Sequence, residues 1–147
     1  MRAIAVLVLC VSFGAAAAEP APEPVTARQT AYRLLRALSR GDAAQARALA
    51  LSPEEFCALS RRAVSASDYR KARDAFLAAL AQDLAAGLTF RDADVADCLV
   101  LPESEKNHRM VLAVVYVHFF LPDGKPLEHP LTLTFVQAQE GWRLLVR

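Results

Sequence analysis

The chain has few of the residues from which common catalytic and cofactor motifs are built. Its five glycines stand at positions 14, 41, 87, 124 and 141, so no glycine-rich loop for a phosphate is present. No Gly-x-Ser-x-Gly sequence is present either, which argues against a hydrolase of that type. The three histidines, His108, His118 and His129, lack the spacing of metal ligands. The sequence therefore predicts no cofactor and no metal site, and it assigns no catalytic residue.

An excess of charge of one sign is also missing. The 147 residues include 17 Lys and Arg and 16 Asp and Glu. A balanced chain has no global attraction for nucleic acid, so no nucleic-acid partner is expected. An acidic run from Asp92 to Glu103 partly resembles a calcium loop. Asp97 stands where that loop needs glycine, however, so we expect no calcium site.

The one long apolar run lies at the N-terminus and has the order of a secretory signal. Arg2 is followed by the apolar residues 3–11 and by four alanines at 15–18, which predicts a signal peptide over residues 1–18. The run is shorter than the roughly 20 apolar residues of a membrane span. Arginine outnumbers lysine and alanine is abundant, which favours a GC-rich bacterial genome and a periplasmic location. A lipid anchor on Cys10 is the alternative.

Two cysteines follow the signal, Cys57 and Cys98. In an oxidising compartment an even pair in a small domain favours a disulfide. The bridge would close a loop of about 42 residues and stabilise the fold by roughly 4 kcal/mol. Two buried thiols packed as small apolar groups are the alternative.

Helical patterns fill the first half of the chain and strand patterns the second. The proline-rich residues 19–25 predict a disordered spacer, and a single domain is expected over 26–147. Apolar spacings of three and four predict helices, with start signals at Asp42 and at Ser52. From Leu88 the period becomes two, and turns separate the expected strands. We predict an α+β fold with three N-terminal helices packed on a curved four-stranded antiparallel meander. The longer helices are expected at 26–40 and 67–86, and the strands at 88–101, 109–121, 127–138 and 141–147.

Three features in chain order resemble the nuclear transport factor 2-like superfamily. They are Arg40-Gly41-Asp42-Ala43 at the end of the first helix, the long helix at 67–86, and the closing strand Gly141-Trp142-Arg143-Leu144-Leu145. The resemblance implies a cystatin-like cone, in which a curved antiparallel sheet wraps around a long helix. It implies little about function, because this fold hosts isomerases, dehydratases, ligand carriers and interaction domains.

Polar residues interrupt the apolar stripe of the long helix. On a helical wheel, Arg73 and Asp83 fall within the stripe that begins at Tyr69. In the resembling fold this stripe faces the sheet, where a pocket would lie. Alternatively, Asp83 reaches solvent near the helix end and Arg73 extends along its methylene stem.

The strand expected at 109–121 has one wholly apolar face, which we predict to be the dry core, and Tyr116 and His118 on the other face. That second face is either a pocket wall or the outer surface. Tyr69, Arg73, Asp83, Tyr116 and His118 together form the candidate pocket.

Four arginines of the first helix have no acidic residue among them. Arg28, Arg33, Arg36 and Arg40 could meet an anionic partner, although such a run is commonly a solvated face.

The function expected from these features is non-catalytic binding of a small apolar ligand or a protein partner in the periplasm. The alternative is a small isomerase- or dehydratase-type enzyme that uses His118 with Asp83 or Tyr116 as acid–base groups.

Overall fold

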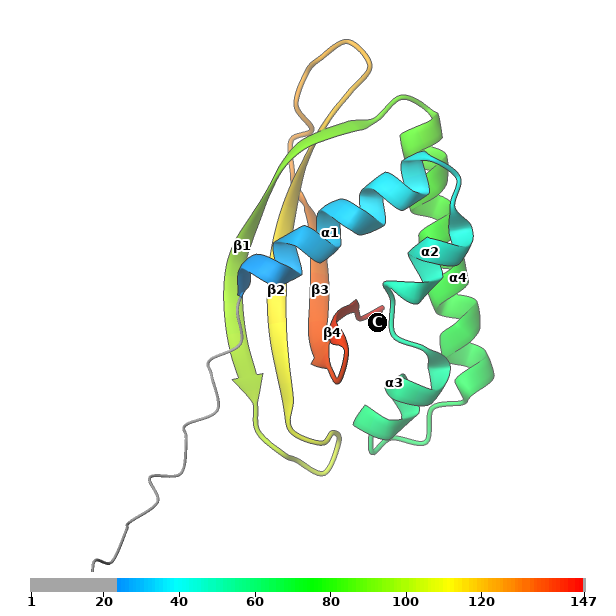
Figure 1. Ribbon diagram of the computed structural model, residues 1–147, viewed down its shortest axis with the longest axis vertical. Coiled ribbons are helices and arrows are strands. Elements are labelled where there is room, and N and C mark those ends of the chain that lie inside the picture. The colour runs from blue at the N-terminus through cyan, green and yellow to red at the C-terminus, as the bar shows by residue number, and fades with distance from the viewer. Residues whose placement is uncertain (1–23, 147) are drawn as a thin grey trace, which may run out of the picture.

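A computed structural model describes residues 24–146 (Figure 1). The α+β class is confirmed: helices come first and a four-stranded antiparallel sheet follows. The signal peptide expected at 1–18, Cys10 and most of the spacer expected at 19–25 lie outside the described residues. The elements are α1 (Pro24–Ser39), α2 (Ala43–Ala48), α3 (Pro53–Leu59), α4 (Ala66–Ala85), β1 (Thr89–Leu101), β2 (Met110–Phe120), β3 (Leu131–Ala138) and β4 (Gly141–Leu144).

The helices within residues 24–146 number four, because each start signal in the sequence begins a helix of its own. Asp42 caps α2 by accepting a 3.0 Å hydrogen bond from the Gln45 backbone amide. Ser52 and Glu55 form a reciprocal capping box on α3, with bonds of 3.0 and 2.8 Å between each side chain and the other residue's amide. α1 begins at Pro24, within the last residues of the expected spacer, since proline is favoured in the first turn of a helix.

The four strands pair in chain order as an antiparallel meander, β1-β2-β3-β4, so β2 is an interior strand as expected. The register of β1 against β2 shifts between Phe90 and Asp92 and again between Val95 and Asp97. Such bulges bend a strand and increase its twist. The strands curve accordingly (Figure 1), and β1 and β4 are the edge strands, with Leu144 of β4 bridged on its outer side to the segment at Ala50.

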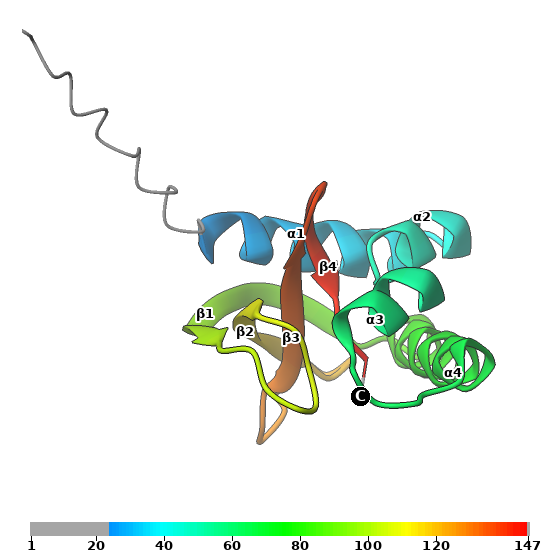
Figure 2. The same ribbon diagram turned by 90° about the horizontal axis from the view of Figure 1, so that it is seen from below.

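One face of the sheet, here the closed face, is covered by α1 (Figure 2). Its β2 side chains are the half-buried Val111 and four that are no more than 3% exposed, Ala113, Val115, Val117 and Phe119. They pack with buried leucines of α1, and the Ala93 amide donates a 3.0 Å hydrogen bond to the Tyr32 hydroxyl. The apolar face of β2 is therefore the dry core, as predicted.

The other face of the sheet, here the open face, carries Met110, Leu112, Val114, Tyr116 and His118 on β2. α4 packs against the other three helices and lies beyond β4 instead of covering this face (Figure 2). Exposure rises along the strand: Leu112 is 2% exposed and Tyr116 is 40% exposed. The Met110 end of this face is thus sheltered, whereas the His118 end is in solvent.

The predicted disulfide between Cys57 and Cys98 is absent, and both cysteines are free and exposed. Cys57 lies on α3, with its Sγ 3.6 Å from the Val64 carbonyl oxygen, and Cys98 lies on β1. The alternative of two buried thiols is wrong as well. The prediction failed because a count of cysteines carries no information on whether the two elements that hold them meet.

Candidate functional site

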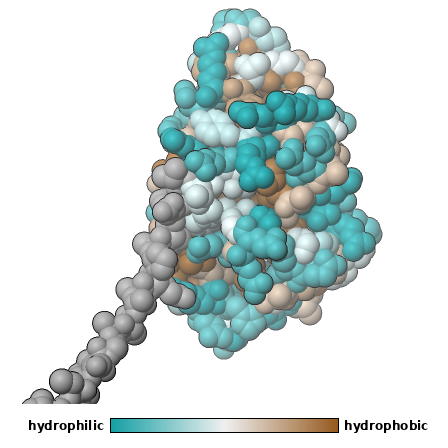
Figure 3. Space-filling view, viewed as in Figure 1, coloured by the Kyte–Doolittle hydropathy of each residue, from teal (hydrophilic) through white to brown (hydrophobic). Residues whose placement is uncertain are grey.

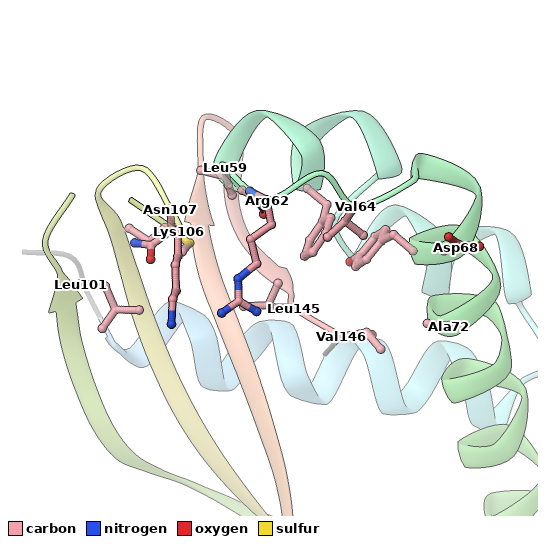
Figure 4. A pocket seen from close by; sticks show the side chains of 14 residues that line it. Leu59, Arg62, Val64, Asp68, Ala72, Leu101, Lys106, Asn107, Leu145 and Val146 are labelled. Atoms are coloured by element: carbon pink, nitrogen blue, oxygen red, sulfur yellow. Dashed lines mark hydrogen bonds between the residues drawn. The ribbon is translucent and has the colours of Figure 1, made fainter. Parts of the chain in front are cut away.

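A large cavity of about 610 Å³ lies between the sheltered end of the open face and helices α3 and α4 (Figure 4). Residues of both helices, the loop between them, the start of β2 and the C-terminal segment form its wall. Its size falls within the roughly 300–1,000 Å³ of typical small-molecule pockets. Most of the wall is apolar, and its main side chains are Phe56, Leu59, Val64, Met110, Leu145 and Val146.

Tyr69 forms a buried part of this wall and brings a polar group into it. The residue is 4% exposed, and its ring stacks on that of Phe56 with centroids 4.1 Å apart and planes inclined by 8°. Its hydroxyl has no hydrogen-bond partner among the described residues, although the backbone of Val146 is close enough to act on its ionisation. Burial raises the pKa of Tyr69 to about 12, so the hydroxyl keeps its proton at neutral pH and can donate a hydrogen bond.

Two loops pair with each other at the mouth of the cavity. The Arg61 amide donates to the Lys106 carbonyl at 3.0 Å, and the His108 amide donates to the Leu59 carbonyl at 3.0 Å. The Arg61 side chain reinforces this pairing through an ion pair with Glu103. The pairing positions two exposed cations, Arg62 and Lys106, whose side chains point into the cavity in Figure 4.

A small cavity of about 160 Å³ adjoins the large one, since Leu145 and Val146 belong to both walls. Its other side chains include Phe76 of α4 and Thr132 and Thr134 of β3. The small cavity therefore lies beside the C-terminal segment, next to the open face of β3.

The structure separates the three candidate pocket residues of the long helix. Tyr69 lines the large cavity, as described above. Arg73 is buried but is not part of either wall. Its guanidinium donates to the Leu51 carbonyl at 3.5 Å and to Asp74 at 3.0–3.1 Å, which joins α4 to the connection between α2 and α3. Asp83 is exposed near the end of α4, as its solvent alternative predicted.

Tyr116 and His118 lie on the exposed end of the open face, and neither lines the large or the small cavity. His118 Nε2 lies 3.3 Å from a carboxylate oxygen of Asp94 on β1, with both side chains exposed to solvent. No hydrogen bond joins any two of Asp83, Tyr116 and His118 within residues 24–146. The acid–base alternative stays a prediction, without support from this geometry.

Three arginines of α1 and the one that follows it are exposed, on a face of the molecule that is largely hydrophilic (Figure 3): Arg28, Arg33, Arg36 and Arg40. An anionic partner for them stays a prediction.

Sequence reasoning missed the residues of the cavity mouth. Arg62 and Lys106 are 44 positions apart by number and come together only through the pairing of two irregular loops. Each of the two basic residues does stand a few positions before an apolar residue of the wall, Arg62 before Val64 and Lys106 before Met110. No periodicity in the sequence links those two segments.

Within the part of the chain that the structure describes, no three His, Cys, Asp or Glu side chains are grouped so that they could hold a metal ion. No helix within residues 24–146 is both long enough and apolar enough to span a bilayer. No family model matches the chain, and neither a curated protein nor a solved structure shows significant similarity to it.

Proposed function

We propose that this protein is a non-catalytic binding domain that holds a small apolar ligand in the large cavity. The observation that carries the proposal is the Tyr69 hydroxyl, which is buried in an apolar wall and has no hydrogen-bond partner among residues 24–146. A buried polar group without a partner costs roughly 1–3 kcal/mol of stability. A ligand with an apolar body and a hydrogen-bond acceptor that reaches this hydroxyl would remove that cost and cover the wall.

The apolar wall supplies the driving force for such a ligand. Burial of apolar surface contributes about 25 cal/mol per Å², and the side chains of Phe56, Met110 and Leu145 face the cavity together. The polar groups of the wall are few and convergent, which is the usual composition of a small-molecule site. A protein partner that inserts an apolar side chain is the alternative occupant.

We extend the proposal to family and location. The order of elements, a helix ending in Arg40-Gly41-Asp42 and a closing Gly141-Trp142 strand support membership of the nuclear transport factor 2-like superfamily. The signal pattern of residues 1–18 supports export to the periplasm. In that compartment the domain would carry or sequester its ligand.

Calorimetric titration with dodecanol, a neutral single-chain probe, tests the proposal. Ala72 lines the cavity from α4, so Ala72→Trp should fill it and weaken dodecanol binding by about tenfold or more, since a steric block removes the apolar contact. Ala79 is exposed on the same helix and is not part of the wall, so Ala79→Trp is the matched control. Failure of dodecanol to bind the wild type, or equal binding by Ala72→Trp, would contradict the proposal.

A further inference from the structure

The charged side chains at the cavity mouth differ in whether they have an ion-pair partner. Arg62 and Lys106 have no ion-pair partner among the described residues, whereas the neighbouring Arg61 is paired with Glu103. Asn107 is also part of the wall, but its amide is bonded within its own loop to Ser104, Pro102 and His108. Two cations are therefore the groups of this loop pair that remain available to a ligand.

The one carboxylate in the wall does not neutralise these cations. Asp68 lies on α4, across the cavity from the two loops (Figure 4). It stands in the first turn of the helix, where the positive end of the helix dipole stabilises an acid. Within the wall, two cations therefore face one carboxylate, although the whole chain is almost neutral.

Both cations are held by backbone pairing and are not carried on free loops. The bridge between Ser60 and Asn107, with the 3.0 Å bond from the Arg61 amide to the Lys106 carbonyl, brings together the two segments that carry Arg62 and Lys106, and both residues line the same cavity. Two donors at the entrance of one apolar cavity suit one small anion attached to an apolar chain. A neutral ligand would leave both cations without a counter-charge, and a cationic ligand would be repelled.

We propose that the ligand is a single-chain amphiphile with an anionic head group, carboxylate or phosphate, which binds between Arg62 and Lys106. Its chain runs past Phe56 and Met110 toward Leu145 and Val146. The inference rests on the proposed function, because it names the ligand class of the same cavity.

The test compares single-chain probes of one length below their micelle concentrations: dodecanoate, dodecyl phosphate, dodecanol and dodecyltrimethylammonium. For the wild-type protein, we expect at least one anionic probe to bind about tenfold more tightly than dodecanol, which corresponds to about 1.4 kcal/mol. The cationic probe should bind more weakly than dodecanol. Added salt should reduce the preference, because the mouth is exposed and its charges are screened. The stronger of the two anionic probes identifies the head group.

Substitutions identify the residues that cause the preference for anionic over neutral probes. Arg62→Gln with Lys106→Gln should bring anionic and neutral probes to within about twofold, because both counter-charges are gone. Arg70→Gln with Lys71→Gln removes the same two residue types from exposed positions of α4 outside the wall, and should keep the preference. Arg62→Lys retains the positive charge and should therefore keep most of the preference for anionic probes.

The outcomes separate the two proposals. Equal binding of anionic and neutral probes by the wild type, or an unchanged preference in the Arg62→Gln, Lys106→Gln protein, would overturn the head-group assignment and leave the apolar cavity intact. Failure of every probe to bind the wild type would overturn both.

Discussion

The two faces of the sheet are built from the same strands and differ in how completely other elements cover them. The closed face is filled by α1, and its side chains at Val115, Val117 and Phe135 are fully buried. The open face is left partly uncovered because α4 packs on the other helices. It borders a cavity that contains two cations and the Tyr69 hydroxyl, which has no hydrogen-bond partner among residues 24–146. The difference teaches that a sheet can fill one face completely and leave part of the other face bordering a cavity that contains polar groups.

The largest expected effect comes from a void in the closed face. Phe135 is 0% exposed, so Phe135→Ala should lower the free energy of unfolding by about 3–5 kcal/mol through lost burial and an unfilled space. Met110→Ala on the open face should cost about 1–2 kcal/mol, since Met110 already borders open space. Urea unfolding of both variants measures the contrast, and equal losses would break it.

Arg73 tests what holds the helical wall of the open face in place. Arg73→Ala should cost about 2–3 kcal/mol, because it leaves the Leu51 carbonyl without its charged donor and removes buried methylene packing. Arg70→Ala is the exposed control on the same helix and should change stability by no more than about 0.5 kcal/mol. Thermal unfolding compares the two. Similar values would show that Arg73 does not anchor α4.

Tyr69 distinguishes a group kept for binding from one kept for stability. Tyr69→Phe should leave the ligand-free protein as stable as the wild type or up to about 1 kcal/mol more stable, since it deletes an unpaired buried hydroxyl. It should also weaken binding of dodecanol severalfold. A clear loss of stability at neutral pH would show that the hydroxyl has a structural partner and would contradict its proposed role.

The same residue predicts a dependence of stability on alkaline pH. The pKa of Tyr69 is raised from 10.0 to about 12 in the folded state, mainly by burial, so folding disfavours the ionised form. Its contribution is complete below the unfolded pKa and is lost as pH rises through the window between the two values. At about pH 11 this group alone should cost about 1 kcal/mol, and Tyr69→Phe should remove that part of the loss. Identical alkaline profiles would contradict the burial of Tyr69.

The smallest expected effect concerns the cysteines, because neither face depends on them. Cys57→Ser with Cys98→Ser should change stability by no more than about 0.5 kcal/mol. Both thiols of the folded wild-type protein should react with a thiol reagent. A bridged pair would instead be unreactive, and its removal would cost about 4 kcal/mol.

Local sequence patterns predicted the elements and the closed face well. Strict alternation on β2 separated Val115 and Val117 from Tyr116 and His118, since a strand has a period of two. Ser52, Pro53 and Glu55 predicted a helix start because capping depends on residues a few positions apart. These features depend on residues that are only a few positions apart in the sequence.

The site depends on contacts between distant segments, and there sequence reasoning was partial. Tyr69 was found because it stands on a helical stripe, and it does line the cavity. Arg73 and Asp83 share that stripe by periodicity, yet a carbonyl of the α2–α3 connection engages one and solvent surrounds the other. The pairing of two loops that sets Arg62 beside Lys106 leaves no periodic trace in the sequence.

The most direct test of the contrast between the faces uses the ε-methyl group of Met110. The chain has two methionines, Met1 and Met110, so a methyl label on methionine reports on the cavity with minimal overlap. A methyl label on valine reports on the closed face. Addition of dodecanoate should shift the Met110 signal in a saturable manner while the methyl signals of Val115 and Val117 stay in place. A Met110 signal that does not respond, or equal shifts on both faces, would contradict the account.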